Sequence, residues 1–254
     1  MTNFYKQIVN ELKELYKNND NILAAWEGGS AATDYLDEYS DLDLALITID
    51  DKVEEIFELT EKFLEENYGI SNKFRMPEPN WHGHSQCFYK LKRSPEFFYV
   101  DFLIEKESAK NRFTESDRHG NSIIWFDKND LIDPTPTPEK DIEDKCKKHY
   151  TLMSTLLPFM EMDIAKQIKR GNAIDAISIY NGLLNRLASM LNIKYRSHKF
   201  DFGLRYYYRD LPKNEVIFIE EISFVKDLND LEVKLPKAIN KYEELIAELG
   251  KKYN

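Results

Sequence analysis

Two acidic residues in the first third of the chain could hold a divalent cation. Asp41 and Asp43 stand two apart in the stretch Asp41 to Ile49, in which residues alternate as they do in a β-strand. Alternation puts both carboxylates on one face of the strand and the intervening leucines on the other, core-facing side. Neighbouring carboxylates repel each other and are costly to desolvate, and Mg²⁺ relieves both penalties because it binds one or two carboxylates together with substrate phosphates. The pair therefore predicts a magnesium site.

A glycine-rich turn, Gly28-Gly29-Ser30, lies ten residues before this pair. It closely follows the apolar run Ile22 to Trp26, which we expect to be a buried strand. Glycine lets the backbone turn sharply and approach a ligand closely. The amides of such a turn, together with the Ser30 hydroxyl, can bind phosphate oxygens. We therefore expect a phosphate-binding turn next to the metal-binding pair.

A third carboxylate stands alone in an apolar segment. Asp101 is the only charged residue in the strand-like stretch Phe97 to Ile104. Burying a lone aspartate is costly unless it binds a metal or transfers a proton. Three carboxylates with bound metal suit in-line phosphoryl or nucleotidyl transfer, in which the metal neutralises the phosphates and one carboxylate accepts the proton of the attacking hydroxyl. Asp101 is therefore the candidate third metal ligand or general base.

Taken together, these motifs resemble the DNA polymerase β-type nucleotidyltransferase superfamily. The shared pattern is an apolar residue, Gly-Gly-Ser, a short spacer, Asp-x-Asp, and a distant strand with an aspartate among apolar residues, and it covers roughly residues 22–105. Within the superfamily, the chain most resembles the bacterial aminoglycoside and lincosamide nucleotidyltransferases. Those enzymes have a minimal nucleotidyltransferase domain followed by a helical bundle, so the resemblance implies the same order here.

The resemblance also implies a role for each residue of the pattern. The catalytic and metal-binding residues would be Asp41, Asp43 and Asp101, the last as ligand or general base. The triphosphate would be bound by Gly28, Gly29 and Ser30. Lys199 begins a segment, Lys199 to Tyr206, that resembles a part of these helical domains in which a lysine reaches the triphosphate. The cofactor would be Mg²⁺, and the co-substrate would be ATP or another nucleoside triphosphate.

The elements that must position these residues alternate between helix and strand in the first half of the chain. Helical spacing of apolar residues predicts an opening helix through Leu15 and another helix after Asp51. Strand patterns cover residues 22–26, 41–49, 86–91, 97–104 and 123–126. Helices and strands around one sheet predict an α/β (α+β) domain with a mixed sheet.

The clearest domain boundary is the segment Asp133 to Pro138, which has prolines at alternate positions. Alternate prolines force an extended backbone and predict a stiff linker over residues 133–139. We expect the nucleotidyltransferase domain over residues 1–132 and a helical bundle domain over residues 140–254. Apolar residues at helical spacing, from Ile174 to Leu191, predict part of the core of that bundle.

Composition narrows the classes of function. The 254 residues include 35 Lys and Arg against 45 Asp and Glu, which gives a net charge of −10. An acidic chain is poorly suited to bind nucleic acid and better suited to a cationic partner. The two cysteines stand in no paired motif, which argues against a disulfide framework and a structural zinc site. Without an apolar run of about 20 residues or a signal peptide, we expect a cytoplasmic protein with no membrane segment.

Other candidate motifs are weaker or missing. His82 and His84 could ligate a metal, but no third ligand is close in sequence and two prolines precede them, so we expect a surface or substrate-lining loop. No P-loop, Rossmann glycine motif or Gly-x-Ser-x-Gly sequence is present, which disfavours those nucleotide-binding folds and a serine hydrolase.

We therefore expect a Mg²⁺-dependent enzyme that transfers a nucleoside monophosphate, AMP from ATP, to a hydroxyl of a small molecule. An aminoglycoside-type antibiotic fits best, since its amines would suit an acidic protein, and antibiotic resistance would then be the role. Two alternatives stay open. The acceptor could be a protein or an RNA, or the chain could be a non-catalytic nucleotide-binding module of the same fold. Both a monomer and a homodimer are compatible with the sequence.

Overall fold

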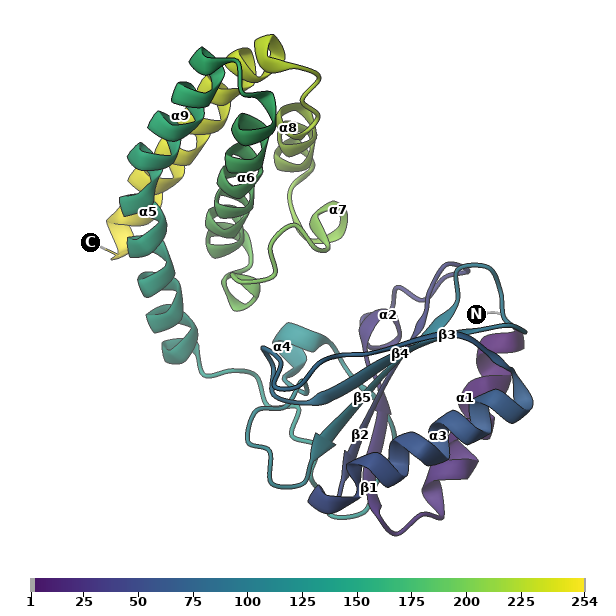
Figure 1. The fold of residues 1–254 in the computed structure, drawn as a ribbon. Helices are drawn as coiled ribbons and strands as arrows, with labels where there is room; N and C mark the ends of the chain where they lie inside the picture. The colour runs from purple at the N-terminus through teal and green to yellow at the C-terminus, as the bar shows by residue number, and fades with distance from the viewer. Residues whose placement is uncertain (1–2, 254) are drawn as a thin grey trace. The chain divides into compact units, whose positions relative to one another are not determined.

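The computed structural model describes residues 3–253, which divide into two compact units between Pro136 and Thr137 (Figure 1). The boundary between them falls within the proline-rich segment. The first unit contains the sheet, and the second is entirely helical.

The first unit is built on a mixed sheet of six strands in the order β3-β4-β5-β2-β1-β6. The strands are β1 (Ile22–Glu27), β2 (Leu42–Thr48), β3 (Ile70–Arg75), β4 (Ser85–Leu91), β5 (Tyr99–Lys106) and β6 (Ile123–Asp127). The central pair of β2 and β5 is parallel, and all other neighbours are antiparallel. The expected mixed sheet is confirmed. Strand β3 was not predicted, because this edge strand is largely exposed and lacks an alternating apolar pattern.

Two long helices, α1 (Asn3–Lys17) and α3 (Val53–Asn67), cover one face of the sheet (Figure 1). The shorter helical turns are α2 (Gly29–Ala32), η1 (Asp50–Lys52) and α4 (Ser116–His119). Leu42, Leu44 and Leu46 of β2 are 0%, 1% and 0% exposed and belong to the core beneath the two long helices. The predicted core-facing side of this strand is therefore confirmed, and Asp43 points to the opposite face.

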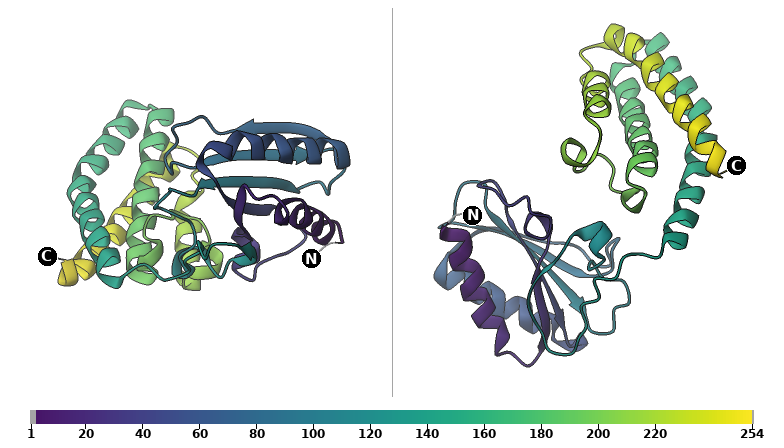
Figure 2. Two further views of the ribbon diagram at one scale, coloured as in Figure 1. Left: turned by 90° about the horizontal axis from the view of Figure 1, so that it is seen from below. Right: turned by 180° about the vertical axis from the view of Figure 1, so that it is seen from behind.

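The second unit is a helical bundle. Its elements are α5 (Glu139–Arg170), α6 (Ala173–Tyr195), η2 (Ser197–Lys199), α7 (Tyr207–Asp210), α8 (Lys213–Ser223) and α9 (Leu228–Tyr253). The long helices α5, α6 and α9 run alongside one another, as Figure 2 shows from two sides. Gly171 ends α5 with a φ of +74°, a left-handed conformation that suits glycine.

The bundle core contains most of the apolar residues predicted for it, and the expected helical domain is confirmed. Ile174 is the exception, since it is 83% exposed at the start of α6. In the part of the chain that the structure describes, no helix combines the length and the apolar character needed to span a membrane.

Candidate active site

The parallel pairing of β2 with β5 brings two of the predicted aspartates together. Asp43 and Asp101 are direct register partners, so their side chains leave neighbouring strands on the same face of the sheet. Burial raises the pKa of Asp101 to about 6; a hydrogen bond from Gln86 opposes this shift, and the charge of Asp41 adds to it. Asp101 is thus a carboxylate that can take up and release a proton near neutral pH.

The third aspartate, Asp41, lies directly before β2 and contacts the first residue of β5. The pKa of Tyr99 is raised by burial first, then by the nearby Asp41 carboxylate and by the charges of Asp101 and Asp43. All three carboxylates therefore affect the pKa of one phenol, which indicates that the three predicted aspartates lie near one another.

The glycine-rich turn lies against this group. The Gly28 N–H donates to the backbone oxygen of Asp43 at 2.9 Å. Gly29 has a φ of +52°, and a Cβ atom at this position would be 1.7 Å from Asp43 Oδ2. Only glycine fits both the backbone conformation and the space, so the turn and the metal-binding candidate are in direct contact.

Ser30 has the property expected of a phosphate ligand. Its Oγ atom is buried, and within residues 3–253 it has no hydrogen-bond partner. A buried hydroxyl without a partner is destabilising, and an incoming oxygen ligand would satisfy it.

The donor set fits a magnesium ion shared with phosphate. Within residues 3–253, no group of three or more His, Cys, Asp or Glu side chains is arranged to hold a metal ion by itself. Mg²⁺ commonly takes one or two carboxylates and completes its shell with water and substrate phosphates. Asp41 and Asp43, next to the unpartnered Ser30 hydroxyl, supply such a partial shell.

Glu27 lies beside the glycine-rich turn and was not among the residues predicted for the site. It is 5% exposed at the end of β1, directly before the turn. Tyr5 Oη donates to Glu27 Oε2 at 2.7 Å, and Trp125 Nε1 donates to Glu27 Oε1 at 2.7 Å. These bonds tie the residue before Gly28 to α1 and β6. A lone charge at the end of an apolar strand, the signal used for Asp101, would have identified it.

Gln86 of β4 is a second missed residue, and it contacts Asp101 directly. Its Nε2 atom donates to Asp101 Oδ1 at 2.6 Å. The strand order places β4 next to β5, and Phe88 is the register partner of Asp101. Gln86 lies two residues earlier on the same strand and therefore on the same face. Nothing in the sequence fixes that register.

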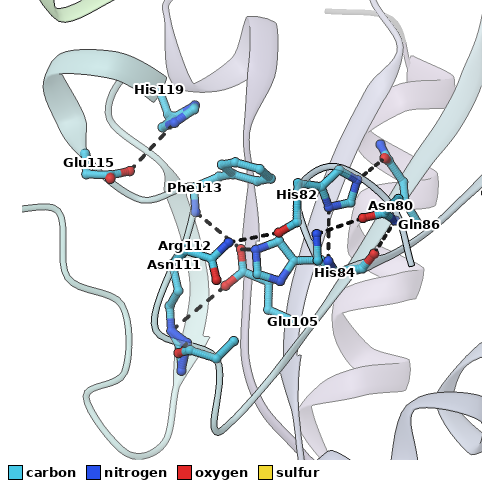
Figure 3. Close-up of polar contacts among 12 residues, drawn as sticks. Asn80, His82, His84, Gln86, Glu105, Asn111, Arg112, Phe113, Glu115 and His119 are labelled. Atoms are coloured by element: carbon cyan, nitrogen blue, oxygen red, sulfur yellow. Dashed lines mark hydrogen bonds and ion pairs between the residues drawn. The ribbon is translucent and has the colours of Figure 1, made fainter. Parts of the chain in front are cut away.

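His82 and His84 lie in a loop, as expected, but their side chains are not at the surface. The two residues are 6% and 3% exposed, and Figure 3 shows both near Phe113. The ring of Phe113 lies 5.8 Å from that of His82 and 5.4 Å from that of His84, measured between centroids. The loop between β5 and β6 thus buries both imidazoles.

A buried carboxylate accompanies these histidines. Glu105 Oε1 lies 4.0 Å from His84 Nε2, and it accepts the Phe113 N–H at 3.3 Å (Figure 3). Burial raises the pKa of Glu105 to about 7 and lowers the pKa of His84 to about 4. Between these values both groups are neutral, so their contact is not an ion pair there. Arg112 Nε, at 3.9 Å from Glu105 Oε2, is the nearby cation.

Lys199 belongs to the second unit, where it lies in a cationic cluster. Its Nζ atom is 3.2 Å from Asp210 Oδ2, which also accepts from Arg196 Nη1 at 2.9 Å, while Arg209 Nε donates to Asp210 Oδ1 at 2.8 Å. Burial alone would raise the pKa of Asp210, but the hydrogen bonds from these three cations lower it to about 2. Three cations therefore share the Asp210 carboxylate.

Several solved structures resemble the chain, and three of them show the low identity of these matches. An aminoglycoside 6-adenyltransferase from Bacillus subtilis is 14% identical, with 98% of this chain and 91% of that chain covered and a TM-score of 0.35. A nucleotidyltransferase-like protein from Exiguobacterium sibiricum is 16% identical, with 96% and 75% covered and a TM-score of 0.40. A STING-associated CdnE c-di-GMP synthase from Capnocytophaga granulosa is 12% identical, with 97% and 80% covered and a TM-score of 0.32.

No curated protein matches the sequence. A family model does: residues 10–96 match the family described as polymerase beta, nucleotidyltransferase. The matched range contains β1, the glycine-rich turn and β2 with its aspartates. Asp101 lies just beyond it, on the strand that pairs with β2. This match, within the first unit, supports the nucleotidyltransferase enzyme class predicted from the sequence.

Proposed function

We propose that this protein is a Mg²⁺-dependent nucleotidyltransferase that transfers AMP from ATP to a hydroxyl group of a small molecule. The observation that carries the proposal is the contact of Asp43 with Gly29, next to Asp101. This contact puts a metal-binding carboxylate, a turn suited to phosphate and a carboxylate titrating near neutral pH side by side.

Each part of the site has a distinct task in this reaction. The turn and the Ser30 hydroxyl bind oxygens of the triphosphate. A divalent ion on Asp41 and Asp43 would neutralise phosphate charge. Asp101, largely ionised at neutral pH, accepts the proton of the acceptor hydroxyl. The acceptor oxygen forms a bond to the α-phosphorus as the bond to pyrophosphate breaks.

Two aromatic rings in the same row as the aspartates, one half-buried and one exposed, support a ring-bearing acceptor. Asp43, Asp101, Phe88 and Phe74 form one register row across β2, β5, β4 and β3. The rings of Phe74 and Phe88 stack at 6.2 Å between centroids, and Phe74 is 58% exposed. A sugar ring that carries amines would stack on these rings and be attracted to the carboxylates beside them. The net charge of −10 also favours a cationic acceptor, such as an aminoglycoside.

Mass spectrometry of the reaction products tests this proposal. Protein and Mg²⁺ would be incubated with each nucleoside triphosphate and a panel of aminoglycosides and lincosamides. We expect one drug to gain AMP, and we expect the Asp41→Asn, Asp43→Asn double variant to lose this activity. Asp20→Asn is a matched control, because Asp20 is an exposed aspartate of the same unit outside the site.

Other outcomes separate the alternatives. If the protein binds the triphosphate but modifies none of the drugs, the proposal that the acceptor is an antibiotic is wrong. Labelling of proteins or RNA in a lysate would then indicate a macromolecular acceptor. Metal-dependent triphosphate binding without pyrophosphate release on any acceptor would instead indicate a non-catalytic module.

A further inference from the structure

Gln86, which donates a hydrogen bond to Asp101, also contacts His82 through the other end of its amide. Gln86 Oε1 lies 3.2 Å from His82 Nε2 (Figure 3), while Nε2 of the same amide donates to Asp101. A side-chain amide has one accepting and one donating end. Because a carboxylate oxygen only accepts, the amino end of Gln86 must face Asp101 and its oxygen must face His82.

The tautomer of His82 is fixed in the same way. The backbone N–H of His84 donates to His82 Nδ1 at 3.1 Å, so Nδ1 carries no proton (Figure 3). Burial lowers the pKa of His82, which favours the neutral imidazole. The remaining proton of a neutral ring is then on Nε2, which faces Gln86 Oε1. Two successive donations, from His82 to Gln86 and from Gln86 to Asp101, therefore run in one direction.

His82 is itself held in place. Asn111 Nδ2 donates to the backbone oxygen of His82 at 2.9 Å, and Asn80 Oδ1 accepts the N–H of the following residue, Gly83, at 2.8 Å. With Phe113 packed on its ring, His82 has little freedom to turn. A rigid donor at this position can impose one orientation on the amide in front of it.

We propose that His82 and Gln86 are positioning residues that set the orientation of the Asp101 carboxylate. Gln86 engages Oδ1, and no other described side chain donates to this carboxylate, so Oδ2 is the oxygen left for a metal ion or for the proton of the acceptor. The inference rests on the proposed function for its catalytic consequence, but the geometry of the relay can be tested without it. Neither residue touches the reacting atoms.

Two substitutions of the same histidine separate the relay from a general structural role. His82→Gln places an amide nitrogen near the former Nε2 and can still donate to Gln86. His82→Asn keeps an acceptor near the former Nδ1 for the His84 N–H but cannot reach Gln86. We expect kcat to fall about 10-fold in His82→Asn and in Gln86→Leu with the KM for ATP unchanged, and to recover in His82→Gln. Equal losses in both His82 variants, or a change confined to KM, would overturn the proposal.

Nuclear magnetic resonance supplies a readout that does not depend on activity. Long-range ¹H–¹⁵N spectra of the imidazole should show the His82 proton on Nε2. The ¹³Cγ resonance of Asp101 should shift in His82→Asn and return towards the wild-type position in His82→Gln. A proton on His82 Nδ1, or an Asp101 resonance that is unchanged in both variants, would contradict the proposed hydrogen bonds from His82 to Gln86 and from Gln86 to Asp101. If the relay holds and no nucleotide is transferred to any acceptor, the proposed function fails instead.

Discussion

The carboxylate of Asp43 occupies the space in which a side chain at residue 29 would have to lie. A Cβ atom on Gly29 would be 1.7 Å from Asp43 Oδ2, whereas a Cβ atom on Gly28 would come no closer than 3.8 Å to Asp43. Of these two adjacent glycines, Gly28 therefore has room for a side chain and Gly29 does not. The metal-binding candidate can keep its position only while residue 29 has no side chain.

This difference predicts unequal effects of alanine in the turn. Gly29→Ala should displace the Asp43 carboxylate and strain a backbone at φ +52°, and we expect transfer to fall by about 100-fold or more. Gly28→Ala meets ordinary van der Waals distances and should cost much less. Steady-state kinetics of the two variants, with thermal unfolding to verify the fold, is the measurement. Equal losses would contradict the steric argument.

The pH dependence of transfer should report on Asp101. Its pKa is raised to about 6 by burial, and the base must be ionised, so kcat/KM should fall as pH drops below about 6. Gln86 donates to the ionised form and thereby lowers the pKa, so Gln86→Leu should move this acidic limb to higher pH. A pH profile that is identical in the wild type and in Gln86→Leu would show that Asp101 is not the titrating base.

The raised pKa of Glu105 predicts that replacing this residue changes the stability of the protein in a pH-dependent way. Its folded pKa of about 7 exceeds the ordinary 4.5, so the fold favours the neutral acid; that stability is present below pH 4.5 and is lost as pH rises through 7. Glu105→Gln removes the charge and keeps an acceptor for the Phe113 N–H. The variant should therefore gain stability over the wild type at pH 8 relative to pH 5, by on the order of 1–3 kcal/mol.

Urea denaturation at both pH values measures this effect. Glu58→Gln, an exposed glutamate of the same unit, is the matched control and should show no such pH dependence. A Glu105→Gln variant that is equally destabilised at pH 5 and pH 8 would mean that ionised Glu105 is well solvated or fully paired with Arg112.

The aromatic row predicts an effect on the acceptor alone. Phe74→Ala and Phe88→Ala should raise the KM for the acceptor several-fold, because stacking on an aromatic ring contributes about 1 kcal/mol. The KM for ATP should not change. Phe224→Ala removes an exposed ring of the second unit and serves as the control. If both KM values rise together in the row variants, the rings support the sheet and not the acceptor.

The catalytic candidates could be found from the sequence because each breaks a local pattern. Asp43 interrupts a run of leucines, and Asp101 interrupts an apolar strand. Each of these patterns can be recognised from the few residues on either side of the aspartate. The turn before them is equally local. The long helices and most strands follow from apolar spacing in the same way, whereas β3 has no such spacing.

The residues that surround the candidates could not be found this way. Gln86 meets Asp101 only through the order of β4 and β5 and their register. The burial of His82 depends on a loop that contains Phe113, far along the chain. Lys199 shares Asp210 with two arginines because the loops of the second unit fold back, a contact that no periodicity describes. Local patterns therefore identify the candidate ligands, and long-range pairing determines their neighbours.

The parallel register of β2 and β5 limits where this chain can gain or lose residues. Every pair from Leu42↔Val100 to Thr48↔Lys106 has the same separation along the chain. Residues inserted in the loop between β3 and β4 would leave that pairing intact. A single residue inserted between Val100 and Asp101 would turn the aspartate from the open face into the core under α1 and α3. Length variation among homologues should therefore be concentrated in the connecting loops and be absent from these two strands.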